Sequence, residues 1–204
     1  MLTKKGYAEQ LIDLLYPNVT EDAKLDEQVA QIAVSQARDA YVRNAVLANK
    51  FETNIIYGNW VSSFYKQPIQ YDKERCEYYT ELPVRVIALP NNAGVQRVFF
   101  KGRVQDEIIP VPMGFKSMFK LQIEADLEGE WGYYLNANRI YYIQDMNSDH
   151  TVSIDLIASA EDLDEDAYFP VDTSATQEIL SAALQLYQLQ KGIPEDVLNN
   201  GISE

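Results

Sequence analysis

Hydrophobic residues at helical spacing mark the first part of the chain. They recur every three or four positions near the start, at Tyr7, Leu11, Leu14 and Leu15. Thr3 is a suitable N-cap for this first helix, and Pro17 ends it. The spacing resumes near Thr20 and continues to about Phe51 without Gly or Pro, which predicts a helix of about 30 residues.

The inner face of this second helix turns small after Ile32, where alanines take over, so that a partner helix can approach closely. A helix of this length is well above the usual value of about 11 residues. It either wraps the core of its own chain or reaches a neighbouring molecule. The pattern leaves both readings open.

The middle of the chain changes to short segments rich in β-branched and aromatic residues, which are typical of strands. Strands are predicted at 54–66, 75–82, 84–89, 95–100 and 151–158, together with a hairpin over 132–143 that turns at Asn136, Ala137 and Asn138. Pro110 and Pro112 favour an extended edge or a loop over 108–115.

The pattern returns to helical spacing near the end. Ser174 and Gln177 have the spacing of a capping box, and Gly192 and Pro194 are stop signals before a last short turn at 194–201. The order predicts an α+β fold with N-terminal helices, a central antiparallel β-sandwich-like core and a C-terminal helix. We expect a single domain over 1–204, with a helical region at 1–50, the β core at 51–160, and an acidic loop and helix at 161–204.

Charge adds a second kind of information. The 204 residues have a formal net charge of -14, which argues against a nucleic-acid coat. Residues 1–120 contain 15 Lys+Arg and 14 Asp+Glu, whereas residues 121–204 contain only Arg139 and Lys191 against 17 acids. This asymmetry is read in two ways: as a solvated acidic face, or as one side of a head-to-tail contact between copies.

Signs of catalysis, metal binding or membrane insertion are weak. One Cys and one His exclude an internal disulfide and a Cys/His zinc site, and no apolar run reaches membrane-spanning length. We interpret His150 as a surface-loop residue and Cys76 as a small core or half-buried residue of a predicted strand. Acids alternate at 145–149 and 162–166, but both runs lack the Gly and Glu of a calcium loop. No catalytic, cofactor or metal residue is predicted.

Paired tyrosines are the more informative feature. Adjacent residues in a strand point to opposite faces, so each pair can place one ring in the core and the other against a partner. Ordinary packing between sheets is the alternative, and sugar binding a lesser one. The predicted interface residues, from the long helix, the hairpin and the last helix, are Val29, Ile32, Ala37, Tyr41, Tyr133, Tyr134, Tyr141, Tyr142, Leu184 and Tyr187.

The order of these motifs resembles the ring, or head-to-tail adaptor, proteins of crAss-like tailed bacteriophages. The resemblance rests on a Tyr-rich strand ending at Leu82-Pro83, a strand ending at Leu89-Pro90, a turn from Asn91 to Gly94, and the Ile109-Pro110 segment. It covers about residues 50–145, and the flanking helices match only in kind. Because the pattern is structural, it implies no catalytic residue.

The resemblance implies a non-enzymatic virion protein of the phage neck, made in the bacterial cytoplasm. It would form a homo-oligomeric, dodecameric ring against the portal and other ring or tail proteins, without a membrane. Genomic DNA would pass through it without sequence-specific binding. One alternative is a carbohydrate- or host-surface-binding β module, marked by exposed tyrosines and by Trp60 or Trp131. A second is a hydrolase with paired carboxylates in a deep pocket.

Overall fold

The structure is a computed structural model that describes residues 3–15, 23–48, 59–90, 93–100, 107–125, 130–146, 150–166, 168–171 and 173–191. Helices precede and follow two central sheets, which confirms the predicted α+β class. The chain forms two compact units. The helical unit contains residues 1–60 and 159–204, and the β unit contains residues 61–158.

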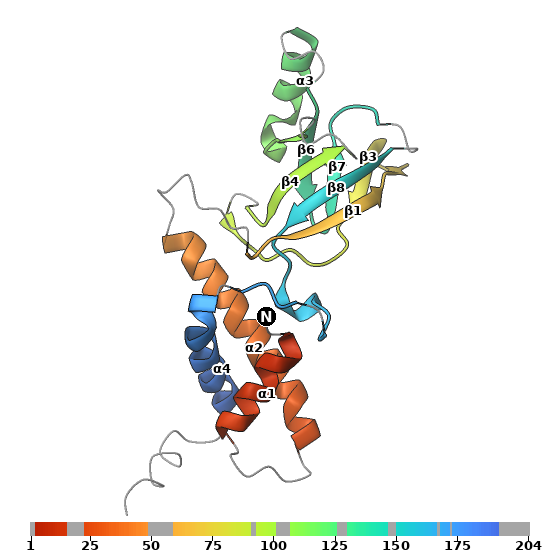
Figure 1. Cartoon of the computed structure of the whole chain (residues 1–204). Coiled ribbons are helices and arrows are strands. Elements are labelled where there is room, and N and C mark those ends of the chain that lie inside the picture. Colours follow the sequence, from red (N-terminus) through yellow and green to blue (C-terminus); the bar gives the residue numbers. More distant parts are fainter. Residues whose placement is uncertain are drawn as a thin grey trace, which may run out of the picture. The chain divides into compact units, whose positions relative to one another are not determined.

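The helical unit is built around three α-helices, which are α1 (Lys4–Leu15), α2 (Ala23–Ala48) and α4 (Thr176–Lys191) (Figure 1). Two 3-10 turns, η3 (Ala160–Asp162) and η4 (Thr173–Ala175), precede α4. Thr3 caps α1 as predicted, because its Oγ1 accepts a hydrogen bond of 3.0 Å from the backbone N–H of Gly6. The helix α4 begins after η4, two residues beyond the predicted cap at Ser174.

Small residues on α2 form the centre of the helical core. Ala30, Ala33, Val34 and Ala37 are fully or almost fully buried, and α2 packs against both α1 and α4. Short side chains allow three helices to approach closely in one layer. The long helix therefore serves the core of its own chain over these positions, which is one of the two readings that the sequence left open.

The β unit contains two sheets. The first has the order β1-β8-β4, formed by β1 (Ser62–Pro68), β8 (Thr151–Leu156) and β4 (Val95–Phe100). The second has the order β2-β3-β7-β6-β5, formed by β2 (Gln70–Asp72), β3 (Glu77–Glu81), β7 (Arg139–Tyr142), β6 (Gly132–Asn136) and β5 (Ile109–Pro110). The pairings between these strands are antiparallel except for β5 with β6, which is parallel.

The β6–β7 hairpin turns where the sequence predicted. Asn136 pairs with Arg139, and Ala137 has φ 53°, a left-handed conformation that a tight turn requires. Both members of each tyrosine pair in this hairpin are buried, because the two faces of the sheet are both covered. The rings of Tyr134 and Tyr141 stack with centroids 5.4 Å apart.

Two local predictions were wrong, and one helix was missed. Residues 84–89 form no strand and make a bridge between Val86 and Ala158, and they are flanked by Pro83 and Pro90, which have no N–H to donate to a strand ladder. Cys76 is exposed in the turn after β2, with φ 53°, and is not a partly buried strand residue. The sequence also missed a helix, α3 (Lys116–Ala125), which follows the 3-10 turn η2 (Met113–Phe115).

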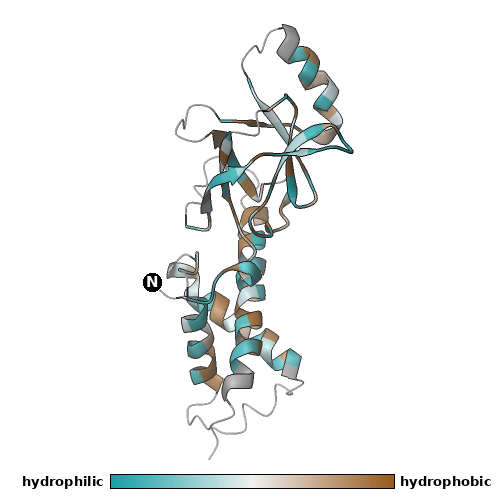
Figure 2. Ribbon diagram, turned by 90° about the vertical axis from the view of Figure 1, so that its right-hand side faces the viewer, coloured by the Kyte–Doolittle hydropathy of each residue, from teal (hydrophilic) through white to brown (hydrophobic). Residues whose placement is uncertain are grey.

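The helix α3 extends away from the strands of the β unit (Figure 1). Apolar and polar residues are mixed along it, as the hydropathy colouring shows (Figure 2). None of the helices in the described ranges combines the length and apolar character that crossing a membrane requires. The predicted last turn at 194–201, with Gly192 and Pro194, lies outside the described residues.

Candidate functional site

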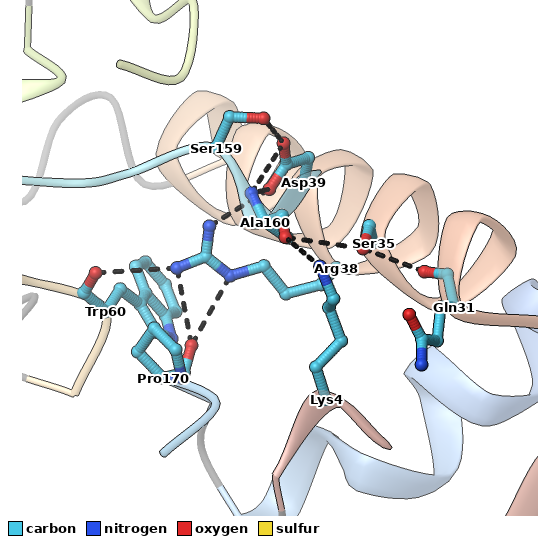
Figure 3. A network of polar contacts seen from close by, with 9 residues as sticks. All are labelled: Lys4, Gln31, Ser35, Arg38, Asp39, Trp60, Ser159, Ala160 and Pro170. Carbon is cyan, nitrogen blue, oxygen red and sulfur yellow. Dashed lines mark hydrogen bonds and ion pairs between the residues drawn. The ribbon is translucent and has the colours of Figure 1, made fainter. Parts of the chain in front are cut away.

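A buried arginine joins distant segments of the helical unit. Arg38 of α2 is fully buried, and its Nε and Nη2 each donate to the backbone carbonyl of Pro170 at 3.3 Å (Figure 3). Nη2 also donates to the carbonyl of Trp60 at 3.4 Å. Burial lowers the pKa of Arg38, while the adjacent carboxylate of Asp39 opposes that shift. The guanidinium is thus a structural clamp between segments.

Asp39 extends the same network to the beginning of η3. Its Oδ1 accepts from Nη1 of Arg38 at 3.0 Å and from the backbone N–H of Ala160 at 3.1 Å. Its Oδ2 accepts from the Ser159 hydroxyl at 2.8 Å. A carboxylate satisfies the first N–H groups of a helical turn in this way, so Asp39 caps η3 from a different helix (Figure 3).

Lys4 fastens the segment that follows. It is 6% exposed, and its Nζ donates to the carbonyls of Ala160, Glu161 and Leu163 at 3.3, 3.4 and 2.9 Å. A cation at the carboxyl end of a helical turn also interacts favourably with its unpaired carbonyls. Lys4 therefore stabilises the backbone of the loop between η3 and α4.

The loop carries a row of acidic side chains, which we call the acidic segment (161–166). Glu161, Asp162, Asp164, Glu165 and Asp166 are all exposed. The backbone carbonyl of Glu165 accepts from the N–H of Lys5 at 3.1 Å, and its Oε2 accepts from Gln31 at 3.3 Å. These hydrogen bonds hold the backbone of the acidic segment in place, while its acidic side chains are exposed.

Stacked tyrosines and arginines form a second cluster, in the β unit. The guanidinium carbon of Arg75 lies 4.9 Å from the Tyr141 ring centroid, and that of Arg139 lies 4.5 Å from the Tyr79 centroid. Nη2 of Arg139 also donates to Glu81 at 3.0 Å. A hollow of about 490 Å³ lies beside these groups, lined by Asp72, Glu74, Arg75, Glu81, Asn136, Ala137, Asn138, Arg139 and Tyr141.

The carboxylate of Asp72, which lines this hollow, accepts several hydrogen bonds. Its Oδ1 accepts from the backbone N–H groups of Glu74 and Arg75 at 3.0 and 3.2 Å, and Oδ2 accepts from the Tyr141 hydroxyl at 3.1 Å. Partial burial acts to raise the pKa of Asp72, but these hydrogen bonds together outweigh it and hold that pKa below its usual value. A carboxyl group with a lowered pKa is ionised at neutral pH. It can stabilise a turn or pair with a cation, but it has no proton to donate there.

Within the described ranges, four exposed apolar side chains lie together in sequence on η2 and α3, and we call them the α3 surface. Its members are Met113, Phe115, Met118 and Leu121, with exposed fractions between 54% and 66%. In the same helix, Phe119 is buried in a cluster with Val111, Tyr134, Tyr141 and Ile143. Phe119 thus fastens α3 to the sheet while the α3 surface faces solvent.

Two lysines accompany these apolar side chains. Lys116 forms an ion pair with Glu77, which also accepts a hydrogen bond from the Tyr134 hydroxyl. Lys120 is exposed one turn later. Residues 108–122 contain no Asp or Glu, but Glu77 balances the charge of Lys116, so the α3 surface is mainly hydrophobic and Lys120 is an exposed basic residue of the same helix.

The structure places most of the predicted interface residues inside their own units. Tyr133, Tyr134, Tyr141 and Tyr142 are core residues of the β unit, and Ala37 and Tyr187 are core residues of the helical unit. Val29, Tyr41 and Leu184 are half-buried against that helical core. Ile32, at 46% exposed, is the member with a free surface. The packing of both sheet faces and of three helices together explains this burial.

Other sequence expectations about chemistry have these outcomes. His150 is exposed, as predicted, and its ring lies 6.1 Å from that of Phe100. Among the described residues, no three His, Cys, Asp or Glu side chains are grouped to hold a metal ion. Trp60 is buried and Trp131 is half-buried. In the first acidic run, residues 147–149 lie outside the described ranges.

The signals for the two features that sequence reasoning missed differ in strength. Met, Phe and Leu recur every three residues from Phe115 to Leu121, which is a helical spacing that could have indicated α3. Arg38 gave no comparable signal, because its acceptors are backbone carbonyls distant in sequence. The chain matches no protein-family model and no curated protein sequence.

Proposed function

We propose that this chain is a non-enzymatic structural protein of a tailed-phage virion. It acts as a ring adaptor of the head-to-tail connector, stacks between portal and tail, and contributes to the DNA conduit. The observation that supports this most is the unlike character of two exposed surfaces, the apolar α3 surface and the acidic segment. A chain that carries two such surfaces is suited to head-to-tail assembly with copies of itself.

The two units also differ in charge, and the helical unit is the more acidic of the two. The helical unit contains 7 Lys+Arg and 18 Asp+Glu, whereas the β unit contains 10 and 13. Net charges of -11 and -3 follow. An acidic surface lining a conduit would repel the phosphates of passing DNA and keep them from binding.

The structural role also accounts for the apolar area on α3. Monomeric soluble proteins seldom expose several large hydrophobic side chains together, and such groups mark contact surfaces. The proposed assembly is a dodecameric ring in the neck of the virion, in contact with the portal and with other ring or tail proteins. It forms from chains made in the bacterial cytoplasm and requires no cofactor.

Quantitative mass spectrometry of purified, DNA-filled particles tests the proposal. The expected result is a fixed ratio to the portal protein, close to one copy per portal subunit. Absence of the chain from intact particles would overturn the structural role. A major capsid protein measured in the same digest calibrates the ratio and separates incomplete recovery from real absence.

The conduit part of the proposal needs its own test. Replacing the acids of the acidic segment with their amides should leave the melting temperature nearly unchanged and slow DNA ejection from particles. Particles with a normal copy number of the variant are compared, so that an assembly defect is not counted as an ejection defect. Unchanged ejection would remove the conduit role and leave the ring role standing.

A second candidate is glycan binding at the hollow of the β unit. Its volume of about 490 Å³ is in the range of small-ligand sites, and carboxylates, amide side chains and a tyrosine line it together. A glycan array with the full chain tests this. Signals that disappear in Asn138→Ala would support binding at the hollow, and an array without reproducible signals would reject it.

A further inference from the structure

We propose that α3 is a strap that holds the turn between β2 and β3 (73–76), which forms part of the hollow, so that the attachment of α3 and the shape of the hollow depend on each other. Few side chains attach this helix to the sheet. Of residues 116–122, Phe119 is buried, Lys116 is half-buried and the others are exposed. The helix extends away from the strands of its own unit (Figure 1).

Phe119 connects the strap to a tyrosine that lines the hollow. Its side chain belongs to one buried cluster with Tyr134 and Tyr141, whose rings stack with centroids 5.4 Å apart. The same Tyr141 lines the hollow, and the guanidinium carbon of Arg75 lies 4.9 Å from the centroid of its ring. Because packed side chains support one another, displacement of Phe119 removes support from Tyr141 and from the guanidinium that lies over it.

The hydroxyl of Tyr141 continues the connection into the turn. It donates to Oδ2 of Asp72 at 3.1 Å, while Oδ1 of Asp72 accepts from the backbone N–H groups of Glu74 and Arg75 at 3.0 and 3.2 Å. Asp72, Glu74 and Arg75 all line the hollow. A continuous series of contacts thus leads from the buried side chain of α3 to the turn that borders the hollow.

Lys116 attaches the strap beside the same turn by a second route. Its Nζ forms an ion pair with Glu77, the first residue of β3, and lies 5.2 Å from the ring centroid of Tyr134. Burial and the positive charges of Lys120 and Arg75 lower the pKa of Lys116, so like charges oppose this ion pair. An element attached by one ring and one opposed ion pair can open locally while the sheet stays folded.

Coupling between two elements is reciprocal. Detachment of α3 should loosen the turn at the hollow, and a loosened turn should let α3 detach more often. The α3 surface and the hollow are then linked through the tyrosines between them. A contact at the first and a ligand in the second would each change the free energy of the other.

The single cysteine of the chain provides a reporter in the turn. Cys76 is exposed after β2, so a nitroxide label on its thiol reports the motion of the turn in an electron paramagnetic resonance spectrum. The mobile component should grow about five-fold or more in Phe119→Ala and in Lys116→Met. Leu121→Ala, which shortens an exposed side chain of the same helix, is the matched control. If Phe119→Ala unfolds the β unit, Lys116→Met decides the question.

Hydrogen exchange measures the reverse direction. Tyr141→Phe keeps the ring and removes the hydroxyl that binds Asp72. The amides of 117–122 should then exchange about two- to five-fold faster, which corresponds to part or all of one hydrogen bond. Tyr142→Phe is the matched control, because its hydroxyl binds Thr80 at 2.8 Å and adjacent strand residues point to opposite faces. This control should leave the exchange of α3 unchanged.

Faster label motion in both attachment variants, together with faster α3 exchange in Tyr141→Phe alone, supports the strap. Wild-type label motion in Lys116→Met and Phe119→Ala would overturn it, as would an equal change in Leu121→Ala. Equal exchange rates in the two tyrosine variants would also overturn it. These measurements need neither particles nor glycans, so the ring and glycan proposals stand or fall separately.

Discussion

Arg38 and Asp39 are neighbours on α2 whose side chains form a 3.0 Å ion pair and yet bind different segments of the chain. The guanidinium of Arg38 donates hydrogen bonds to the carbonyls of Trp60 and Pro170, while the carboxylate of Asp39 accepts one from the N–H of Ala160. Removing Arg38 takes this buried donor from the carbonyls of Pro170 and Trp60 and leaves Asp39 without its ion-pair partner, which is far more destabilising than losing a surface pair.

Arg38→Met should therefore destabilise the helical unit by about 3 kcal/mol. Equilibrium denaturation in urea, followed by circular dichroism, measures the change. Arg43→Met is the matched control, because Arg43 is exposed on the same helix and should shift the free energy of unfolding by less than about 0.5 kcal/mol. Equal effects of the two variants would contradict a clamp role for Arg38.

Lys4→Met should loosen the acidic segment. The carbonyls of Ala160, Glu161 and Leu163 lose a buried donor, at a cost of about 1–3 kcal/mol. Hydrogen exchange of the amides in 160–166 should accelerate more than exchange in α4. Lys5→Met, at an exposed neighbouring position, should leave these rates unchanged, and acceleration of similar size in both variants would argue against the role of Lys4.

The attachment of α3 to the sheet depends on the absence of a side chain at Gly132. A Cβ there would lie 2.9 Å from Cδ1 of Phe119 and closer still to its Cε1. Gly132→Ala should destabilise the β unit by about 1–3 kcal/mol, as overpacking does. Gly114→Ala is the control, because a Cβ at Gly114 meets nothing within 4 Å.

A double-mutant cycle identifies the cause of that effect. In a Phe119→Leu background the smaller side chain leaves room, so Gly132→Ala should cost less than it does in the wild type. Thermal unfolding of the four proteins gives the coupling energy. Additive effects would place the strain somewhere other than the contact between residues 119 and 132.

Sequence reasoning succeeded where local chemistry decides the structure. The Thr3 cap, the turn at Ala137 and the end helices follow from residue type and spacing. It missed α3, where two prolines stand before η2 and apolar residues face solvent, contrary to the usual rule that they face a core. Contacts such as that of Arg38 with Pro170 depend on segments more than 100 residues apart, which periodicity does not report.

The tyrosine pairs show the same limit. Alternation along β6 and β7 correctly separates neighbouring rings onto two faces, but it does not tell what covers each face. Phe119 of α3 packs over Tyr134 and Tyr141, while the Tyr142 hydroxyl is hydrogen bonded to Thr80 at 2.8 Å. A helix that the sequence did not indicate thus helps to bury two of the tyrosines that were assigned to a predicted interface.

Acid should weaken the β unit through Asp72. Because hydrogen bonds lower the pKa of Asp72 in the folded state, its contribution is complete above the unfolded value of about 3.9 and is lost as pH falls through the lower folded value. Melting temperatures measured between neutral and strongly acidic pH should fall less steeply in Asp72→Asn. Glu74→Gln, an exposed carboxylate in the same turn, should keep the wild-type slope.

Alkaline pH should destabilise the β unit through ionisation of Tyr133 and Tyr142. Burial raises the pKa of both hydroxyls, so their contribution to stability is complete below the ordinary tyrosine value of about 10 and is lost as pH rises above it. Tyrosinate absorbance should therefore show a late step that coincides with loss of circular dichroism. In Tyr142→Phe that step should shrink, and an unchanged step would mean that Tyr142 ionises while folded.

The pairing of β1 with β8 has a consequence for synthesis. Ser62 lies opposite Leu156 at the two points where the chain enters and leaves the β unit, so this unit is a continuous insertion with adjacent ends. During synthesis, α1 and α2 leave the ribosome first, and the roughly 100 residues of the β unit follow. Only afterwards does α4 emerge and complete the helical core. The β unit can thus fold before α4 has been synthesised. A variant in which a short linker replaces the β unit should fold as the helical unit alone.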